Sequence, residues 1–258
     1  MGTFLESVVE RTQADLARRK RATPAADLEA RLGPRRRGRP FSEALIDEGI
    51  SLIAEMKRAS PSRGPIRPGA SVAEIVGAYQ TAGARAVSVL TEPAHFGGSI
   101  DDLAEARAAC DLPLLRKDFL IDPYQVLEAR AAGADAVLLI VAALAPERLA
   151  EMMGAASDLG MDSLVEVHDE DEVAAAVEAG AELLGINNRD LHSLDIDLGT
   201  TFRLLADVPA GTVVVAESGI TARGHVAELE DAGVDAILVG EALMRADDPS
   251  LAIRELLG

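Results

Sequence analysis

Short apolar runs alternate with longer amphipathic stretches through most of this chain. At four points an apparent helix ends in Ala-Gly, and a small residue, a polar residue and an apolar run follow it. A glycine just past a helix end adopts the left-handed backbone that turns the chain into the next strand. Each copy therefore predicts a helix-to-strand junction, and the four junctions lie at 82–87, 132–137, 179–184 and 232–237.

The glycines of these four copies are 50, 47 and 53 residues apart, which is the length of two strand–helix units, so the chain is predicted to contain eight units. The apolar runs are continuous rather than alternating, as in parallel strands that helices cover. Polar residues at Ser71, Ser99, Asp122 and Thr221 predict helix starts. Strands are predicted at 51–57, 86–90, 113–117, 135–141, 163–167, 182–187, 212–217 and 236–240.

Strict alternation of strands and helices is compatible with a closed barrel or with an open doubly wound sheet. The near-equal units favour closure, because an open sheet has edge strands that should look different. No Gly-x-Gly-x-x-Gly follows the first strand, which argues against a dinucleotide-binding sheet. The predicted fold is α/β, a single (β/α)8 barrel of the TIM-barrel type.

About 50 residues precede the first strand, and their pattern predicts helices. A first helix is expected near the N-terminus and a second, short one at 41–46. The apolar residues on one side of the first helix are Phe4, Leu5, Val8, Val9 and Leu16. We expect residues 1–48 to be a helical extension packed on the barrel of residues 49–258, where it closes the bottom or frames the mouth.

Charge is distributed unevenly along the chain. The formal net charge is −18, yet residues 1–40 contain ten Lys and Arg against five Asp and Glu. The remaining body is strongly acidic, so we expect no nucleic-acid or membrane partner. The basic run at 35–39 is short, flanked by prolines and without aromatic residues for base stacking, so we interpret it as a solvated loop. An anionic substrate would need local cations and backbone N–H groups.

No apolar run approaches the roughly 20 residues that span a bilayer, and residues 1–20 lack the apolar stretch of a signal peptide. The single cysteine, Cys110, cannot form an internal disulfide, and no Cys/His cluster has the spacing of a zinc site. We therefore expect a cytoplasmic protein that uses no metal.

Barrel active sites lie at the carboxyl ends of the strands, so polar residues there are candidates. Glu55 and Lys57 end the first strand, are two residues apart and therefore point to the same side. A charged pair in an apolar strand is costly unless the groups pair or function. The third strand ends in Arg116 and Lys117, and periodicity does not decide which faces inward. A lysine there would lose hydration, which would lower its pKa towards neutrality and suit a general acid.

Further candidates end the fifth and sixth strands. Glu166, flanked by two valines, is a candidate base. His168 is interpreted as an ordinary loop histidine. Asn187 and Arg189 share a side, where they would offer a hydrogen-bonding amide and a fork for a carboxylate, although Asn-Asn-Arg-Asp is also common in turns.

Two glycines follow the last two strands, each at the start of a helical segment: Gly219 and Gly240. Phosphate-binding barrels place backbone N–H groups and a short helix N-terminus at these positions. The pair therefore predicts a small phosphorylated molecule as the substrate.

Five segments together resemble the indole-3-glycerol-phosphate synthase family. They are IAEMKRASPS at 53–62, LRKDF at 115–119, VEVH at 165–168, GINNRDL at 185–191 and ESGI at 217–220. The resemblance runs from the N-terminal extension to the last strand. It implies an enzyme of tryptophan biosynthesis that converts 1-(2-carboxyphenylamino)-1-deoxyribulose 5-phosphate into indole-3-glycerol phosphate, carbon dioxide and water without a cofactor.

The resemblance also implies a role for individual residues. Lys117 would protonate the ribulose oxygen, and Glu166 would be the base. Lys57, paired with Glu55, would be an acid and an electrostatic anchor, and the division of labour between the two lysines stays open. Asn187 and Ser218 would be catalytic residues that position the substrate hydroxyls and the carboxylates of the site. The substrate would be held by Arg189 at its carboxylate, Ser60, Gly219 and Gly240 at its phosphate, and Phe96, Phe119, Leu138 and Leu238 at its ring. Each of the last four is equally compatible with a plain core position.

Two other functions fit parts of the pattern. Phosphoribosylanthranilate isomerase, a related barrel, should begin almost directly with its first strand and use a cysteine there, whereas Cys110 precedes the third strand. A catalytically silent barrel that binds a phosphate ligand should lack at least one of Lys57, Lys117 and Glu166. The sequence does not determine the oligomeric state, and we expect a monomer or a weak homo-oligomer.

Overall fold

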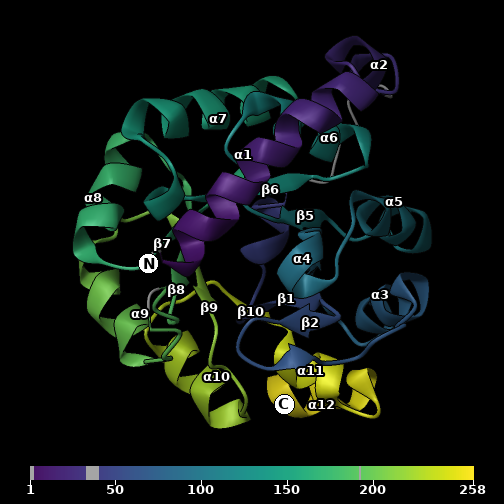
Figure 1. The fold of residues 1–258 in the computed structure, drawn as a ribbon. Helices are drawn as coiled ribbons and strands as arrows, with labels where there is room; N and C mark the ends of the chain where they lie inside the picture. The colour runs from purple at the N-terminus through teal and green to yellow at the C-terminus, as the bar shows by residue number, and fades with distance from the viewer. Residues whose placement is uncertain (1–2, 33–40, 192) are drawn as a thin grey trace.

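The computed structural model describes residues 3–32, 41–191 and 193–258. Within them, eight parallel strands close into a barrel that helices surround (Figure 1). Around the barrel the strands are β1 (Ser51–Met56), β4 (Ala86–Leu90), β5 (Leu114–Lys117), β6 (Ala136–Ile140), β7 (Asp162–Val167), β8 (Leu183–Asn187), β9 (Val213–Glu217) and β10 (Ala236–Val239). Each predicted strand agrees with an observed one to within one residue at either end. The predicted TIM barrel with an N-terminal helical extension is confirmed.

Helices that follow the strands cover the outside of the barrel (Figure 1). They are α3 (Val72–Thr81), α5 (Ile100–Ala109), α6 (Pro123–Ala131), α7 (Pro146–Asp158), α8 (Glu170–Glu178), α9 (Gly199–Leu204), α10 (Arg223–Asp231) and α12 (Pro249–Leu257). Shorter elements are β2 (Ala59–Ser60), β3 (Gly64–Pro65), α4 (Pro93–Phe96), α11 (Glu241–Arg245) and the 3-10 turns η2 (Val141–Ala143) and η3 (Leu205–Asp207).

Three of the four predicted helix caps are confirmed. Ser71, Ser99 and Asp122 each accept a hydrogen bond from a backbone N–H in the first turn of the following helix. Thr221 does not cap α10, because this helix begins after Ala222, whose side chain has no oxygen. A side-chain cap satisfies one of the free N–H groups of the first turn and so determines where the helix starts.

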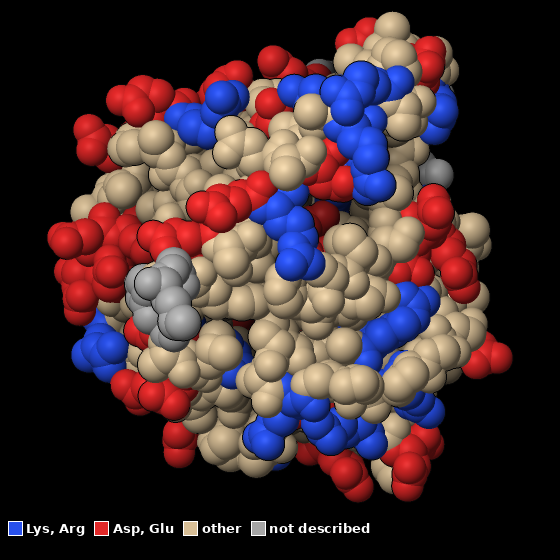
Figure 2. Space-filling view, viewed as in Figure 1, with Lys and Arg blue, Asp and Glu red and all other residues tan. Residues whose placement is uncertain are grey.

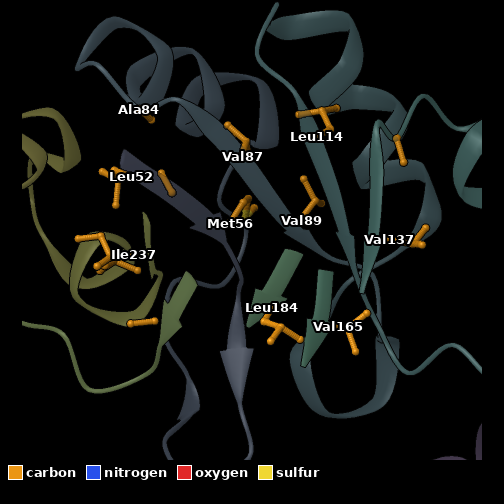
Figure 3. Packing of buried hydrophobic residues seen from close by; sticks show 14 of the residues in the cluster. Leu52, Met56, Ala84, Val87, Val89, Leu114, Val137, Val165, Leu184 and Ile237 are labelled. Atoms are coloured by element: carbon orange, nitrogen blue, oxygen red, sulfur yellow. The ribbon is translucent and has the colours of Figure 1, made fainter. Parts of the chain in front are cut away.

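Side chains on the strands alternate between the inside of the barrel and the surrounding helices. Leu52, Val87 and Val165 belong to a cluster between strands and helices, part of which Figure 3 shows. Ile53 and Leu164, each next to one of these in sequence, belong to a separate cluster inside the barrel. Because side chains two apart on a strand share a side, the same alternation decides which residues point into the mouth at the strand ends.

This alternation decides which residue of β5 faces inward. Arg116 lies on the helix side and is only 1% exposed. Its guanidinium donates to Thr91 Oγ1 at 3.1 Å, to Asp118 Oδ2 at 2.9 Å and to the Gln125 carbonyl at 2.8 Å, so the buried charge is satisfied. Lys117, the next residue, therefore points into the barrel.

The N-terminal extension reaches both ends of the barrel. α1 (Phe4–Ala22) crosses the mouth, and α2 (Ala25–Glu29), which the sequence pattern did not predict, packs beside α6 (Figure 1). The expected short helix at 41–46 is the 3-10 turn η1 (Glu43–Leu45), where Phe41 is buried among barrel-interior residues. Ser42 Oγ donates to Asp162 Oδ2 at the start of β7, at 2.9 Å. One segment thus closes the bottom and another covers the mouth, while the boundary after residue 48 stays a prediction.

Charged side chains are segregated on the surface. Figure 2, seen from the same side as Figure 1, shows Lys and Arg gathered over α1 and α2, and Asp and Glu gathered over α8. Ion pairs tie α1 to the barrel, from Arg19 to Glu128 and from Lys20 to Asp122. The basic run at 35–39 lies outside the described residues. None of the helices in the described ranges combines the length and the apolar character that crossing a bilayer requires.

Candidate active site

Charged side chains meet at the carboxyl ends of alternate strands. They occupy inward positions on β1, β5, β7 and β9: Glu55, Lys117, Glu166 and Glu217. Lys117 Nζ lies 2.9 Å from Glu166 Oε2 and 3.0 Å from Glu217 Oε2. Lys57 Nζ lies 2.7 Å from Glu55 Oε1. The two lysines are thus paired with three buried carboxylates, and the described part of the chain contains no His, Cys, Asp and Glu cluster arranged to hold a metal ion.

Beside this charged layer is a cavity of about 560 Å³, a size that encloses a small ligand. All fourteen residues proposed from the sequence line it: Glu55, Lys57, Ser60, Phe96, Lys117, Phe119, Leu138, Glu166, Asn187, Arg189, Ser218, Gly219, Leu238 and Gly240. The structure therefore brings them together in one place. The role of each residue stays a prediction.

Lys117 differs from the expectation in its pKa. Burial alone would lower the pKa, as predicted, but the carboxylates of Glu166, Glu217 and Glu55 outweigh burial and raise it above the ordinary value. The expectation of a pKa near neutrality is therefore wrong. Lys117 is fully protonated at neutral pH, which is the state a general acid needs before it donates a proton.

The two carboxylates beside Lys117 have opposite pKa shifts. At Glu166 burial raises the pKa, but Lys117 and His168 outweigh burial and hold the pKa well below the usual range. At Glu217 burial prevails over the attraction of Lys117, the charge of Glu166 adds to it, and the pKa rises to about 7. Two carboxylates that share one ammonium are not both fully ionised near neutrality, and Glu217 is the one that takes up a proton.

Glu217 belongs to this layer although the sequence analysis did not propose it as a site residue. Its Oε2 contacts Lys117, while its buried Oε1 has no hydrogen-bond partner among the residues that the structure describes. A signal was present, because Glu217 ends an apolar strand at an inward position, as Glu55 and Glu166 do. Glu217 also opens the segment ESGI at 217–220, of which only the serine and the glycine were proposed as site residues.

The second oxygen of Glu166 has two further neighbours. Asn187 Nδ2 donates to Glu166 Oε1 at 3.1 Å, and His168 Nε2 lies 3.3 Å from the same atom. His168, which was expected to be a satisfied loop histidine, lies in the loop after β7 with two carboxylate partners, and one of them is the candidate base. Asn187 Oδ1 accepts a hydrogen bond from the Arg189 backbone N–H at 3.1 Å, so this amide connects the candidate base to the end of β8.

The residues predicted to bind phosphate line the same cavity as the charged layer. Ser60 Oγ is buried and has no hydrogen-bond partner in the described chain. Ser218 and Gly219 both have left-handed backbones, with φ of 66° and 82°. This conformation is unusual for a serine and marks a constrained turn of the kind found at functional sites.

Cations also line this cavity. Glu241 Oε1 is 3.1 Å from Arg245 Nε and 3.4 Å from Arg63 Nε, and all three residues line the cavity. Two guanidinium groups against one carboxylate leave a net positive charge. This is the local cation that an anionic substrate of an acidic protein requires.

Apolar side chains form part of the cavity wall: Phe4, Phe96, Phe119, Leu138 and Leu238. The Phe119 ring centre lies 6.2 Å from that of Phe4 and 6.4 Å from that of Phe96. Phe4 comes from α1, so the extension contributes to the wall, a role that the sequence pattern did not predict. Leu138 and Leu238 also belong to the cluster inside the barrel, so the wall and the core share them.

Comparison with known proteins decides the family. The model of the family described as indole-3-glycerol phosphate synthase matches residues 5–256. The chain belongs to the indole-3-glycerol phosphate synthase family. The resemblance seen in the five sequence segments is therefore confirmed over nearly the whole chain.

Curated members of the indole-3-glycerol phosphate synthase family align with the chain from end to end. Indole-3-glycerol phosphate synthase 2 of Streptomyces coelicolor is 51% identical over 258 residues, covering 100% of both chains. The synthase of Rhizorhabdus wittichii is 48% identical over 261 residues, covering 100% of this chain and 99% of its own. The synthase of Dehalococcoides mccartyi is 49% identical over 259 residues, covering 98% and 100%.

Solved structures outside the indole-3-glycerol phosphate synthase family share the fold. A thiamine phosphate pyrophosphorylase from Pyrococcus furiosus has a TM-score of 0.62 at 22% identity and covers 84% of this chain and 95% of its own. A 3-hexulose-6-phosphate synthase from Salmonella typhimurium also has a TM-score of 0.62, at 16% identity, and covers 80% and 96%. At these identities the similarity concerns the barrel alone.

Proposed function

We propose that this chain converts 1-(2-carboxyphenylamino)-1-deoxyribulose 5-phosphate into indole-3-glycerol phosphate, carbon dioxide and water, as a carboxy-lyase of tryptophan biosynthesis. Membership of the family supports this reaction. The observation that carries the proposal is the position of Lys117 Nζ beside the cavity, 2.9 Å from Glu166 and 3.0 Å from Glu217. Ring closure and dehydration need a charged proton donor next to proton acceptors.

Ring closure joins the aromatic carbon that bears the carboxylate to the carbonyl carbon of the ribulose. The carbonyl electrons move to the oxygen, and we assign Lys117 as the acid that protonates this oxygen. A charge already held in place in a buried site stabilises the developing oxyanion without reorganisation. Loss of carbon dioxide then returns the bonding electrons to the ring and restores its aromaticity.

Dehydration removes the new hydroxyl as water and takes one proton from the new five-membered ring. We assign Glu166 as the base, because its lowered pKa keeps it ionised at neutral pH. Lys57, held by Glu55, is the second acid and the electrostatic anchor. Glu217, whose pKa of about 7 lets it exchange protons near neutrality, is assigned to return Lys117 to its charged form between turnovers.

Substrate binding is assigned to the remaining cavity residues. We place the phosphate at Ser60, Gly219 and Gly240, because the free hydroxyl of Ser60 and the backbone of the two glycines line the cavity. Arg189 is assigned to the anthranilate carboxylate, since its guanidinium offers a planar fork. Asn187 and Ser218 are assigned to the substrate hydroxyls, and the ring is placed against Phe96, Phe119, Leu138 and Leu238. No step needs an external oxidant, reductant or group carrier, so the proposal includes no cofactor.

The decisive experiment supplies the carboxyphenylamino-deoxyribulose phosphate to the purified chain and records indole fluorescence. We expect fluorescence to rise in proportion to enzyme concentration, together with release of carbon dioxide. A chain that binds the substrate, seen by calorimetry, and yet produces no indole would be the silent phosphate-binding barrel instead.

We also propose that the reaction takes place in the cytoplasm and that the protein is a monomer or a weak homo-oligomer. The residues assigned to the site line one cavity within a single chain, which supports a monomer that is active by itself. Sedimentation would show at which protein concentration any oligomer dissociates. Specific activity is therefore expected to stay constant when the protein is diluted below that concentration. Activity that vanishes on dilution would contradict this assignment.

A further inference from the structure

His168 connects the candidate base to the helix that follows it. The residue comes directly after β7, and α8 begins two residues later. Its ring Nδ1 lies 2.9 Å from Glu172 Oε2, and its backbone N–H donates to the same oxygen at 2.8 Å. Its Nε2 forms an ion pair with Glu166 Oε1 at 3.3 Å. The ring therefore lies between two carboxylates.

Both ring nitrogens face carboxylate oxygens, which favour the doubly protonated, positively charged ring. Burial opposes a charge on the ring, but the carboxylates of Glu166 and Glu172 outweigh burial and raise the pKa of His168 to about 10. The turn η2, which packs against β7 and α8, consists of Val141, Ala142 and Ala143 and adds no titratable group. The neighbour on β8, Asn187, is neutral. His168 is thus a cation at neutral pH.

We propose that His168 is a positioning residue for Glu166. Its imidazolium, anchored on Glu172, holds Glu166 Oε1 so that Oε2 stays on Lys117. The inference rests on the proposed function, in which Glu166 is the base. It adds a residue outside the cavity lining that orients the base through an ion pair and touches no substrate.

The charges around Glu166 explain why the contact with His168 matters for the ionised state of the base. Within the described ranges, Oε1 has polar contacts with Asn187 and His168, and of these two His168 carries the charge. The other cation at Glu166 is Lys117, which Glu217 shares. Without His168, the two carboxylates would compete for one ammonium, and Glu166 would take up a proton more readily. A protonated Glu166 accepts no proton from the substrate.

Two substitutions test whether His168 positions Glu166 or only stabilises the start of α8 through Glu172. In His168→Gln the side-chain amide extends to the place of Nε2 and keeps a donor for Glu166, but nothing replaces Nδ1. In His168→Asn the shorter amide takes the place of Nδ1 beside Glu172 and leaves Glu166 without its donor. The two variants are both neutral and differ by one methylene group, so each controls for the lost charge of the other.

We expect His168→Asn to lower kcat by about 10- to 100-fold, the effect of losing one charged contact to the base, while KM changes much less. His168→Gln should retain more kcat than His168→Asn. In both variants the acid limb of the kcat profile should move to higher pH, because removing a cation raises the pKa of Glu166. Wild-type kcat with an unshifted acid limb in His168→Asn, or a reversed order of the two variants, would overturn the proposal.

An NMR titration tests the same contact without catalysis. The chain has four histidines, and comparison with His168→Asn assigns the ring signals of His168. We expect the wild-type ring to stay protonated above pH 8 and its pKa to fall in Glu166→Gln and in Glu172→Gln. An unchanged His168 pKa in Glu166→Gln would contradict the inference that His168 positions Glu166. A wild-type chain that makes no indole would refute the proposed function, while this titration would still decide whether His168 holds Glu166.

Discussion

Gly185 on β8 has no side chain, and this leaves room for the carboxylate of Glu217 on the neighbouring strand β9. A Cβ at position 185 would come 2.3 Å from Glu217 Oε1. Gly240 stands in the same relation to Glu55, whose Oε1 would lie 2.4 Å from a Cβ there. Protein interiors are close-packed, so a buried carboxylate needs a space that a neighbour leaves empty. Gly185 and Gly240 leave this space for two of the three carboxylates, Glu217 and Glu55.

Gly185→Ala is expected to push the Glu217 carboxylate off Lys117. Overpacking of this kind should lower the unfolding free energy by roughly 1–3 kcal/mol, measured by urea unfolding, and kcat should fall with it. Glu217→Ala removes the clash, so Gly185→Ala should cost little when it is added to Glu217→Ala. Losses that simply add in the double variant would contradict direct contact between the two positions.

Lys117→Met should abolish most of the activity while product analogues still bind. Methionine keeps the length of the side chain and loses the proton, so kcat is expected to fall by roughly 10²–10⁴, the usual contribution of a general acid. The matched control is Lys20→Met on α1, whose ion pair with Asp122 lies on the surface. Near-normal turnover in Lys117→Met, measured by indole fluorescence, would remove Lys117 from the mechanism.

Glu217 makes stability depend on pH. Its pKa of about 7 in the folded protein is above the ordinary value, so the folded state binds the extra proton. Its contribution to stability is therefore complete below about pH 4 and is lost as the pH rises through 7. Glu217→Gln cannot ionise, so its unfolding free energy should improve relative to wild type between pH 5 and pH 8. Urea unfolding across this range measures the difference, and a difference independent of pH would show that Glu217 is ionised throughout.

Gly219→Ala should raise KM for the phosphorylated substrate. The backbone at 219 is left-handed, and a Cβ there would come 2.6 Å from Ile196 Cγ2 in the cavity wall. Gly211→Ala is the control, because its φ of 93° imposes a similar backbone cost while nothing lies within 4 Å of its Cβ. Both variants should lose stability, but only Gly219→Ala should change KM. Equal KM values in the two variants would move the phosphate away from the 218–219 turn.

Much of the fold could be predicted from local sequence patterns, such as apolar runs and helix-capping residues. The apolar run 136–140 is a strand, and Ser71 and Asp122 cap helices, because each needs only its own neighbours along the chain. The cap predicted at Thr221 was wrong by one residue, which is the usual uncertainty of a helix end. α2 was missed because five residues are too few to show a period.

The sequence predicted most of the residues that line the candidate site, but not the contacts that they make with one another. Residues of all five recognised segments line one cavity, because parallel strands end on the same side of a barrel. Phe4 was not assigned to the site, since nothing in a helix pattern tells which part of the barrel the helix crosses. The partners of His168 were not predicted for a similar reason: its two carboxylates are known only when the ring is placed between them.

The sequence alone determined eight strand–helix units, an acidic body with a basic N-terminal segment, and a set of polar strand ends that resembles one enzyme family. Only the tertiary structure decided that Lys117 rather than Arg116 faces inward, because a period of two leaves the phase to the neighbouring strands. It also decided that the pKa of Lys117 rises instead of falling. That shift comes from carboxylates on other strands, Glu217 among them a hundred residues away in the chain, which barrel closure brings to within 3.0 Å.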